Sequence, residues 1–148
     1  MSLDEKDLVI LKILKENSKL TSSQISKETR IPITTIHNRI KKLENSSIIK
    51  KYTVKINYEK IGKPLKAYIL VTANQHPLNN KKISQEEIGK KIKMVEDVDY
   101  VDIITGVSDL IVQIRASTMK ELNNFITEKL RNVEGVERTQ TLMVLKEM

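Results

Sequence analysis

The chain has 148 residues, which is enough for one ordinary domain or two small ones. Its 39% hydrophobic content supports globular cores, whereas its longest apolar runs fall far short of the ~20 residues that cross a bilayer. The absence of cysteine excludes disulfides, thiol catalysis and Cys-ligated zinc. The acidic, amphipathic start MSLDEKDLVI does not fit a secretory signal, so we expect a cytoplasmic protein.

The net charge of +7 is distributed unevenly along the chain. Residues 1–62 carry 13 Lys and Arg against 7 Asp and Glu, a net of +6, and residues 63–148 carry 13 against 12, a net of +1. This asymmetry suggests polyanion binding by the N-terminal part and another role for the C-terminal part. Lysine-rich surfaces also simply aid solubility, and charge alone leaves the two interpretations even.

The first predicted helix lies in the segment SLDEKDLVILKILKENSKL. Leu8, Leu11 and Leu14 recur at helical spacing and give it one apolar face. Ser2 followed by Glu5 suggests a capping box, and acids in the first turn suit the helix dipole.

Two further short helices follow. Thr21 with Gln24 three residues later is a second start signal, which predicts a helix through about residue 29. Pro32 interrupts the pattern, and a third helix is predicted over residues 33–45. Three short helices whose last two are joined by a tight turn indicate a helix-turn-helix.

The third helix has a distinctive outer face. If Ile36, Ile40 and Leu43 point inward, short hydrogen-bonding groups lie near the N-terminal end of the opposite face and cations lie farther along. A recognition helix in a major groove needs this order, with base-edge readers at its tip and phosphate contacts behind. The face has no acid before Glu44, which favours DNA binding over simple solvation. The face comprises Thr34, Asn38, Lys41 and Asn45, flanked by His37 and Lys42.

Individual residues of this helix allow different interpretations. Asn38 is the best candidate for reading adenine. His37, taken alone, fits a solvated surface histidine better than a contact. Arg39 points toward the edge of the buried face, and it ranks equally as a phosphate contact and as a structural residue paired with Glu28 or Glu44.

The segment after the helix, SSIIKKYTVKINYEKIG, alternates and is rich in β-branched residues. This pattern predicts a strand from about Ile49 to Asn57. Lys50 and Lys51 lie where a wing would reach a flanking phosphate. Such contacts add affinity and salt dependence but no sequence specificity.

The C-terminal half contains two copies of one strand-helix-strand theme. The junctions KMVEDVDYVDII and RNVEGVERTQTL even resemble each other. The order β-α-β-β-α-β predicts a ferredoxin-like fold, with both helices on one face of an antiparallel sheet. We expect the open face to hold many aliphatics and to pair with another copy of the chain. The segments are 66–75, 83–96, 98–106, 109–116, 118–134 and 136–147.

The predicted fold class is therefore α+β, with an N-terminal helix-turn-helix (winged-helix-like) domain and a C-terminal ferredoxin-like βαββαβ domain. We place the DNA-binding domain at residues 1–48, a connecting strand or linker at 49–65, and an oligomerisation and effector-sensing domain at 66–148.

The hairpin TGVSDL joins the two middle strands. Gly106 can adopt a positive φ and let another group approach the backbone. Free amides there would accept a ligand's carboxylate, and Asp109 would attract its ammonium group. Gly and Asp are also simply what a turn prefers, and from the residues alone the turn is favoured.

The stretches DLVILKILKENSKLTSSQIS, TTIHNRIKKLENSSIIKKYTVKINYEKIG and TGVSDLIVQI resemble the Lrp/AsnC (feast/famine) transcription regulators, and the resemblance covers nearly the whole chain. It implies operator binding by the N-terminal domain, assembly into dimers and often octamers, and a small-molecule effector, commonly an amino acid. It carries Thr35, Ile36, Arg39, Ile40 and Leu43 onto the recognition-helix pattern. It also makes the hairpin a candidate effector site, comprising Gly106, Val107, Ser108 and Asp109.

Three features depart from the family pattern. Ser47 and Lys51 stand where the family usually has glycine, so the turn after the recognition helix must form without it. Val107 and Ser108 replace a frequent aromatic-containing pair, which puts the usual ligand preference in doubt. The polar loop at 74–83 is longer than typical.

The leading hypothesis is a homo-oligomeric regulator that binds a pseudo-palindromic operator. An effector-independent architectural DNA binder is the alternative, supported by the altered hairpin. An enzyme is the third possibility and is disfavoured, because the chain has no cysteine and its two histidines, His37 and His76, show no metal or triad spacing. No cofactor or metal is expected. An RNA-binding sheet is disfavoured by the 3% aromatic content.

Overall fold

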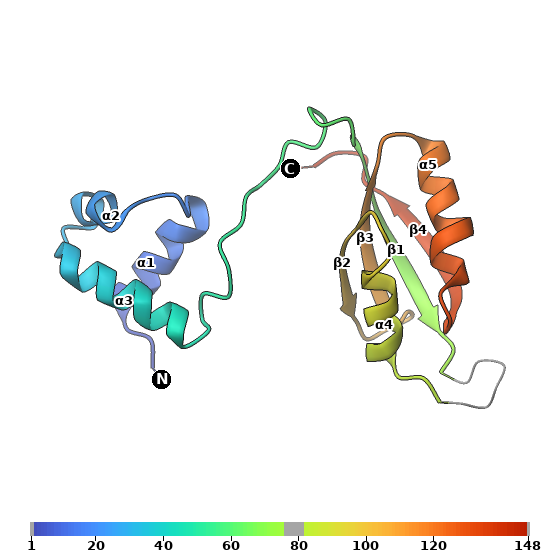
Figure 1. The fold of residues 1–148 in the computed structure, drawn as a ribbon, viewed down its shortest axis with the longest axis horizontal. Helices are drawn as coiled ribbons and strands as arrows, with labels where there is room; N and C mark the ends of the chain where they lie inside the picture. The colour runs from blue at the N-terminus through green and yellow to red at the C-terminus, as the bar shows by residue number, and fades with distance from the viewer. Residues whose placement is uncertain (1, 76–81, 148) are drawn as a thin grey trace. The chain divides into compact units, whose positions relative to one another are not determined.

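The computed structural model describes residues 2–75 and 82–147. The chain divides into two compact units, residues 1–56 and 57–148 (Figure 1). The predicted connecting segment at 49–65 is thus shared between the two units. Part of the polar loop noted at 74–83, together with His76, lies outside the described residues.

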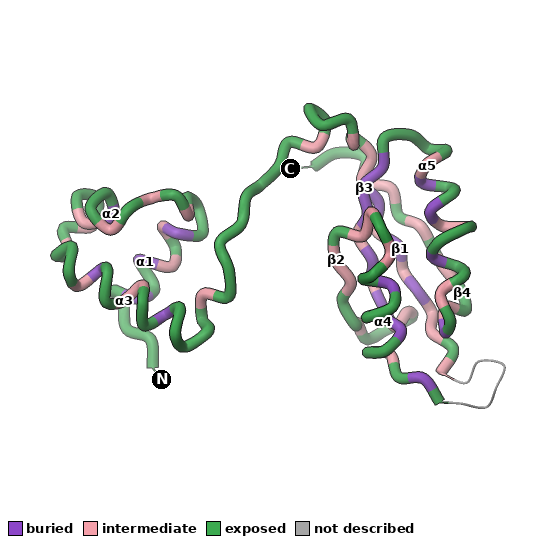
Figure 2. The backbone as a smooth tube through the Cα atoms, in the orientation of Figure 1, coloured by how far each residue is buried: buried purple, intermediate pink, exposed green. Residues whose placement is uncertain are grey.

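The first unit consists of three helices, α1 (Glu5–Glu16), α2 (Ser22–Thr29) and α3 (Ile33–Asn45). Each helix contributes to one small core, and buried stretches alternate with exposed ones along all three (Figure 2). Ile36 and Leu43 of α3 are fully buried and Ile40 packs beside them, which confirms the predicted inward face. The remaining core residues are Ile10, Leu14 and Ile25.

The helix starts were predicted with mixed success. Thr21 and Gln24 form the expected capping box of α2. The prediction of Ser2 and Glu5 for α1 is wrong, because Asp4 is the N-cap residue. Its side chain accepts a hydrogen bond from the Asp7 N–H at 3.0 Å, and Asp7 in turn accepts from the Asp4 N–H at 3.2 Å. Carboxylates at both places also favour the positive end of the helix dipole.

The chain turns after α3 without glycine. Ser47 adopts a left-handed conformation with φ 57°, and the N–H groups of Ile48 and Ile49 both donate to the Leu43 carbonyl. The strand predicted over Ile49–Asn57 is not formed in the structure. A strand needs a neighbour to bond its backbone, and these residues have no ladder partner within residues 2–75 and 82–147.

The second unit has the predicted βαββαβ order. Its elements are β1 (Leu65–Ala73), α4 (Gln85–Lys93), β2 (Val98–Ile103), β3 (Leu110–Ala116), α5 (Met119–Asn124) and β4 (Val136–Met143). A π turn and a 3₁₀ turn extend α5 through Asn132. The antiparallel strands lie in the order β2-β3-β1-β4, which is the ferredoxin-like arrangement.

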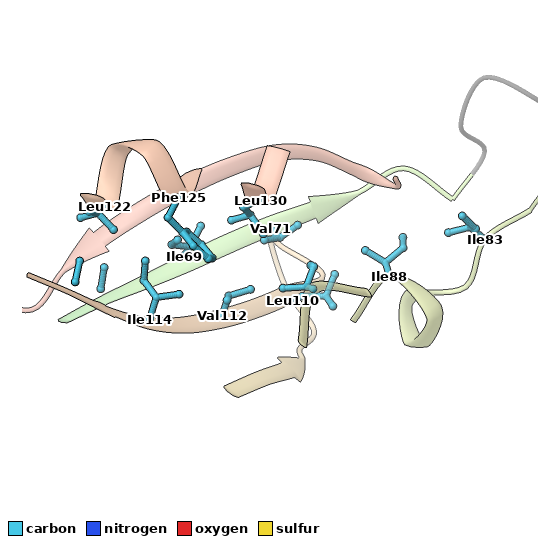
Figure 3. Packing of buried hydrophobic residues seen from close by; sticks show 13 residues of the cluster. Ile69, Val71, Ile83, Ile88, Leu110, Val112, Ile114, Leu122, Phe125 and Leu130 are labelled. Carbon is cyan, nitrogen blue, oxygen red and sulfur yellow. The ribbon is translucent and has the colours of Figure 1, made fainter. Parts of the chain in front are cut away.

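The core of this unit lies between the sheet and its two helices. Alternate residues of β1 and β3 point toward α4 and α5, as Figure 3 shows for Ile69, Val71 and Val112. Gly135 allows α4 to approach closely, because a Cβ at this position would lie 2.6 Å from Ile88 Cδ1.

The opposite face of the sheet carries no helix (Figure 1). The strand registers place Leu70, Ile111 and Leu142 on it, but among tyrosines and polar side chains. The face is therefore more polar than we expected, because most aliphatics of β1 and β3 alternate to the helix side. The face also carries Lys66, Tyr68, Thr72, Tyr100, Asp102, Gln113, Arg115, Arg138 and Gln140.

On this face, a cluster of ionic and aromatic contacts joins residues near the two ends of the second unit. Arg115, only 9% exposed, lies 4.0 Å from the centroid of the Tyr58 ring and donates to Glu147 at 2.7 Å. Lys66 pairs with the same carboxylate at 2.8 Å. The hydrogen bond from Lys66, together with that from Arg115, lowers the pKa of Glu147 to about 2.

The left-handed Ser47 predicts a stability difference between two neighbouring serines. Ser47→Gly should raise the free energy of unfolding by about 1 kcal/mol, because glycine adopts a positive φ without steric cost. Ser46, at φ −86°, is the matched control, and Ser46→Gly should be destabilising. Urea denaturation followed by circular dichroism measures both; equal effects of the two substitutions would contradict the assignment.

The lowered pKa of Glu147 predicts a pH-dependent contribution to stability. Because its folded-state pKa lies below the ordinary value of 4.5, the contribution is complete above pH 4.5 and disappears as the pH falls toward 2. Glu147→Gln should therefore lower the Tm at pH 7, with the difference from the unmodified protein closing over this range. A Tm difference that does not change with pH would show that the ion pairs do not cause it.

Candidate DNA-binding and effector sites

The exposed face of α3 carries most of the predicted DNA-binding residues. Thr34, His37 and Asn38 are exposed along the first half of the helix. Farther along, a shallow hollow of about 430 Å³ is lined by Asn38, Lys41, Lys42, Asn45 and Ser46. Thr35 is half-buried at the edge of this face. The structure thus brings together the amide and the cations that the sequence predicted.

The cations around this face are available for an external anion. The exposed side chains of Lys41, Lys42, Lys50 and Lys51 make no ion pair with the described residues. Lys50 and Lys51 directly follow the turn that Ile48 and Ile49 close onto α3. They therefore extend the positive charge of the helix without a strand-built wing.

The segment carrying these lysines is held to α3 by a side-chain hydrogen bond. The Tyr52 hydroxyl donates to Glu44 Oε1 at 2.7 Å. Partial burial, together with this bond to a carboxylate, raises the pKa of Tyr52 to about 12. The hydroxyl accordingly stays protonated at neutral pH and keeps its donor role.

Arg39 turns away from the open face and toward α1. Its Nη1 atom lies 2.7 Å from carboxylate oxygens of Asp4 and Asp7. Asp4, then Asp7, raises the pKa of Arg39 through these hydrogen bonds. The Asp7 N–H, followed by Arg39, lowers the pKa of Asp4. The proposed partners Glu28 and Glu44 were wrong.

This arrangement assigns Arg39 a structural role that the sequence left open. Asp7 is only 2% exposed, so its carboxylate depends on Arg39 and on the Asp4 N–H for compensation. The sequence pointed to the acids of α1 only as helix-dipole partners. Their distance of more than thirty residues from Arg39 gave no signal of the pair.

The four predicted effector residues lie in the hairpin between β2 and β3 but have different surroundings. Gly106 has φ 134° and is exposed, Val107 is 93% exposed, and Ser108 is half-buried. Asp109 is bound from both sides: Oδ2 accepts the Ala73 N–H at 2.8 Å, and Oδ1 accepts Gln85 Nε2 at 2.7 Å. Its carboxylate thereby joins the hairpin to β1 and α4.

Val107 and Ser108 border a pocket on the open face of the sheet. The pocket has a volume of about 360 Å³. Leu70 and Thr72 of β1 and three successive residues of β4 complete it. No pattern in the sequence points to the β4 residues, because only the sheet register brings them beside the hairpin. These residues are Arg138, Thr139 and Gln140.

Residues 2–75 and 82–147 also bear on metal binding and on membrane insertion. They contain no group of three or more His, Asp or Glu that could hold a metal ion. In the same residues, no helix is long and apolar enough to cross a membrane.

Comparison with known families matches both units. The profile of the winged helix-turn-helix DNA-binding family covers residues 3–50, and that of the Lrp/AsnC ligand binding domain covers residues 66–148. Together with the exposed face of α3, these matches define a DNA-binding transcription regulator and not an enzyme. The chain belongs to the Lrp/AsnC family.

Its relatives include the HTH-type transcriptional regulator FL11 of Pyrococcus furiosus. The two are 37% identical over 144 residues, which is 97% of this chain and 90% of the relative. FL11 of Pyrococcus abyssi is also 37% identical, over 99% of this chain and 91% of its own length.

Solved structures show the same fold. The regulator NMB0573 of Neisseria meningitidis, in a complex with L-Met, is 26% identical with a TM-score of 0.89, over 99% of this chain and 92% of that one. LrpC of B. subtilis, at 22% identity, has a TM-score of 0.84 over 100% and 98% of the two chains and supports the fold alone. The recognised resemblance and fold class are therefore confirmed.

The role of Arg39 can be separated from a phosphate contact by salt dependence. Each phosphate contact contributes about 0.9 to the slope of log K against log salt. Arg39→Gln should lower the Tm by several degrees, since it leaves a buried carboxylate uncompensated, and should leave the slope unchanged. Lys41→Gln is the matched control: the slope should shrink by about one contact while the Tm stays constant. A reduced slope for Arg39→Gln would instead make Arg39 a phosphate contact.

Proposed function

We propose that this regulator reads a pseudo-palindromic operator through α3 and the lysines that follow it. The observation that carries the proposal is the exposed Asn38 between short hydrogen-bonding groups and unpaired cations on one helix face. Asn38 can bond an adenine edge in the major groove, and Thr34, Thr35 and His37 add shorter-range contacts. Lys41, Lys42, Lys50 and Lys51 bind the flanking phosphates.

A homodimer is part of the proposal. Two surfaces support it: the open face of the second unit's sheet and the extended segment 50–57, whose backbone lacks a strand partner. In the segment, Tyr52, Val54 and Ile56 are exposed, with Val54 at 77%. A two-fold dimer presents two recognition helices to half-sites about one helical turn, or a multiple of one, apart. Further assembly of dimers to an octamer belongs to the same hypothesis.

We further propose that a small molecule such as an amino acid regulates the protein in the cytoplasm. The NMB0573 structure contains L-Met, and the hairpin of this chain borders a pocket of its own. An effector acts by binding two DNA-binding or assembly states with different affinity. The hairpin residues Gly106, Val107, Ser108 and Asp109 are the region where such a ligand would act.

An effector-independent architectural DNA binder is the second candidate. It is favoured by Asp109, whose carboxylate oxygens both bond to the protein itself. In that case the second unit would serve assembly alone.

Binding to the protein's own upstream promoter region tests the regulator function. The unmodified protein should bind this DNA far more tightly than a scrambled control, across a salt series. Asn38→Ala should lose about 1–3 kcal/mol of specific binding and little non-specific binding. Lys50→Gln with Lys51→Gln should weaken binding to both DNAs and reduce the salt slope.

An amino-acid mixture separates the two candidates in the same assay. A change in specific affinity supports an effector-sensing regulator, whereas specific binding indifferent to the mixture favours the architectural protein. Equal, weak binding to both DNAs, or a uniform effect of Asn38→Ala on both, would contradict base reading by α3.

A further inference from the structure

The pocket beside the hairpin contains an arginine that the fold leaves unpaired. Arg138 pairs in register with Thr72 of β1, and both lie on the open face of the sheet. Arg138 makes no ion pair or side-chain hydrogen bond with the described residues. By contrast, Arg39, Arg115 and Arg131 all bond to neighbouring side chains.

The pocket lining combines this cation with polar groups and a short apolar wall. Ser108, Thr72 and Gln140 provide hydrogen-bonding side chains, and Leu70 and Val107 provide the apolar surface. Among the residues that the structure describes, no carboxylate lines the pocket. Its volume of about 360 Å³ lies in the range of small-molecule sites.

Asp109 lies outside the lining of the pocket, and its carboxylate is held by two hydrogen bonds within the protein. Its two carboxylate oxygens accept hydrogen bonds from Ala73 and Gln85 at 2.8 and 2.7 Å. Both donors are neutral and hold the carboxylate within the hairpin, and the described lining of the pocket contains Arg138 but not Asp109. The charge that a ligand would meet in this pocket is therefore the positive charge of Arg138.

We propose that the pocket binds a small organic acid, whose carboxylate pairs with the Arg138 guanidinium, and that an α-ammonium group contributes little to recognition. The planar guanidinium donates two parallel hydrogen bonds to a carboxylate, which gives both affinity and orientation. A 2-oxo acid and the amino acid with the same side chain then bind alike, and the corresponding amine does not. The proposal rests on the effector sensing proposed above and names its ligand class.

The position of the pocket suggests how such a ligand would act. The pocket lies between the tip of the β2–β3 hairpin and strands β1 and β4, on the face where a second copy of the chain is proposed to bind. A bound acid would neutralise Arg138 on that face. It would thereby change the contacts available to the second copy.

Isothermal titration of the full-length protein with matched ligands tests the ligand class. The first set is L-methionine, 4-(methylthio)-2-oxobutanoate and 3-(methylthio)propylamine; the second is L-leucine, 4-methyl-2-oxopentanoate and 3-methylbutylamine. In at least one set the amino acid and the oxo acid should bind within about threefold of each other, and the amine at least tenfold more weakly. Tighter binding of the amine than of the oxo acid, or no binding by either set, would overturn the proposal.

Substitutions test whether Arg138 is the residue that binds the ligand's carboxylate. Arg138→Gln should weaken binding of the oxo acid at least tenfold, and Arg138→Lys should restore part of it. Lys120→Gln, which removes an exposed cation on α5 of the same unit, should change the affinity less than twofold. If Arg138→Gln leaves the affinity unchanged while Asp109→Asn, shown by circular dichroism to be folded, selectively loses L-methionine, recognition belongs to Asp109 and the proposal fails.

DNA binding measured alongside keeps the two proposals separate. Acid binding that depends on Arg138 but leaves operator affinity unchanged would uphold the site and contradict effector sensing. Operator affinity that responds to an amino-acid mixture equally in the unmodified protein and in Arg138→Gln would uphold sensing and contradict this site.

Discussion

The DNA-reading face of α3 depends on how firmly the other face of the same helix is fixed. Ile36 and Leu43 bury the inner side, and Arg39 at its edge bonds to Asp4 and Asp7 of α1. Among the described residues of this unit, five apolar side chains are fully or nearly fully buried. A directional contact therefore adds orientation that so small a core supplies weakly. The positively charged face can then remain unpaired within the protein without loss of helix position.

The second unit makes the same turn before a strand twice, with a different residue at the left-handed position each time. The similar junctions VEDV and VEGV each place their third residue at a positive φ, Asp97 at 73° and Gly135 at 92°. At Gly135 a side chain would collide with Ile88, so glycine is required. At Asp97 the side chain is accommodated, and its carboxylate pairs with Lys63 and Lys129. The internal repeat seen in the sequence is thus a repeat of backbone geometry, and the local packing decides which residue fits.

Local patterns predicted the features that local physics determines. The bounds of α3, the capping box at Thr21 and the βαββαβ order all follow from signals within a few residues of one another. Features that depend on a distant partner were missed. The segment 50–57 has a strand pattern but no strand to pair with in the chain, and Arg39 bonds to acids more than thirty residues away. The polarity of the open sheet face likewise depends on the register, which alternation in a single strand does not determine.

The arginines of this chain show why residue type alone could not identify its sites. The sequence singled out Arg39, whose guanidinium lies against two carboxylates, and passed over Arg138, which faces a pocket without an acid. The hairpin gives a similar example for a carboxylate. The sequence suggests that Asp109 could bind a ligand's ammonium group, yet its oxygens bond to Ala73 and Gln85. A charged side chain whose bonds are already made within the fold contributes to stability, and one without an ion-pair partner is available to a ligand. The two proposed sites both use cations that have no ion-pair partner among the described residues, around α3 for phosphates and at Arg138 for a carboxylate.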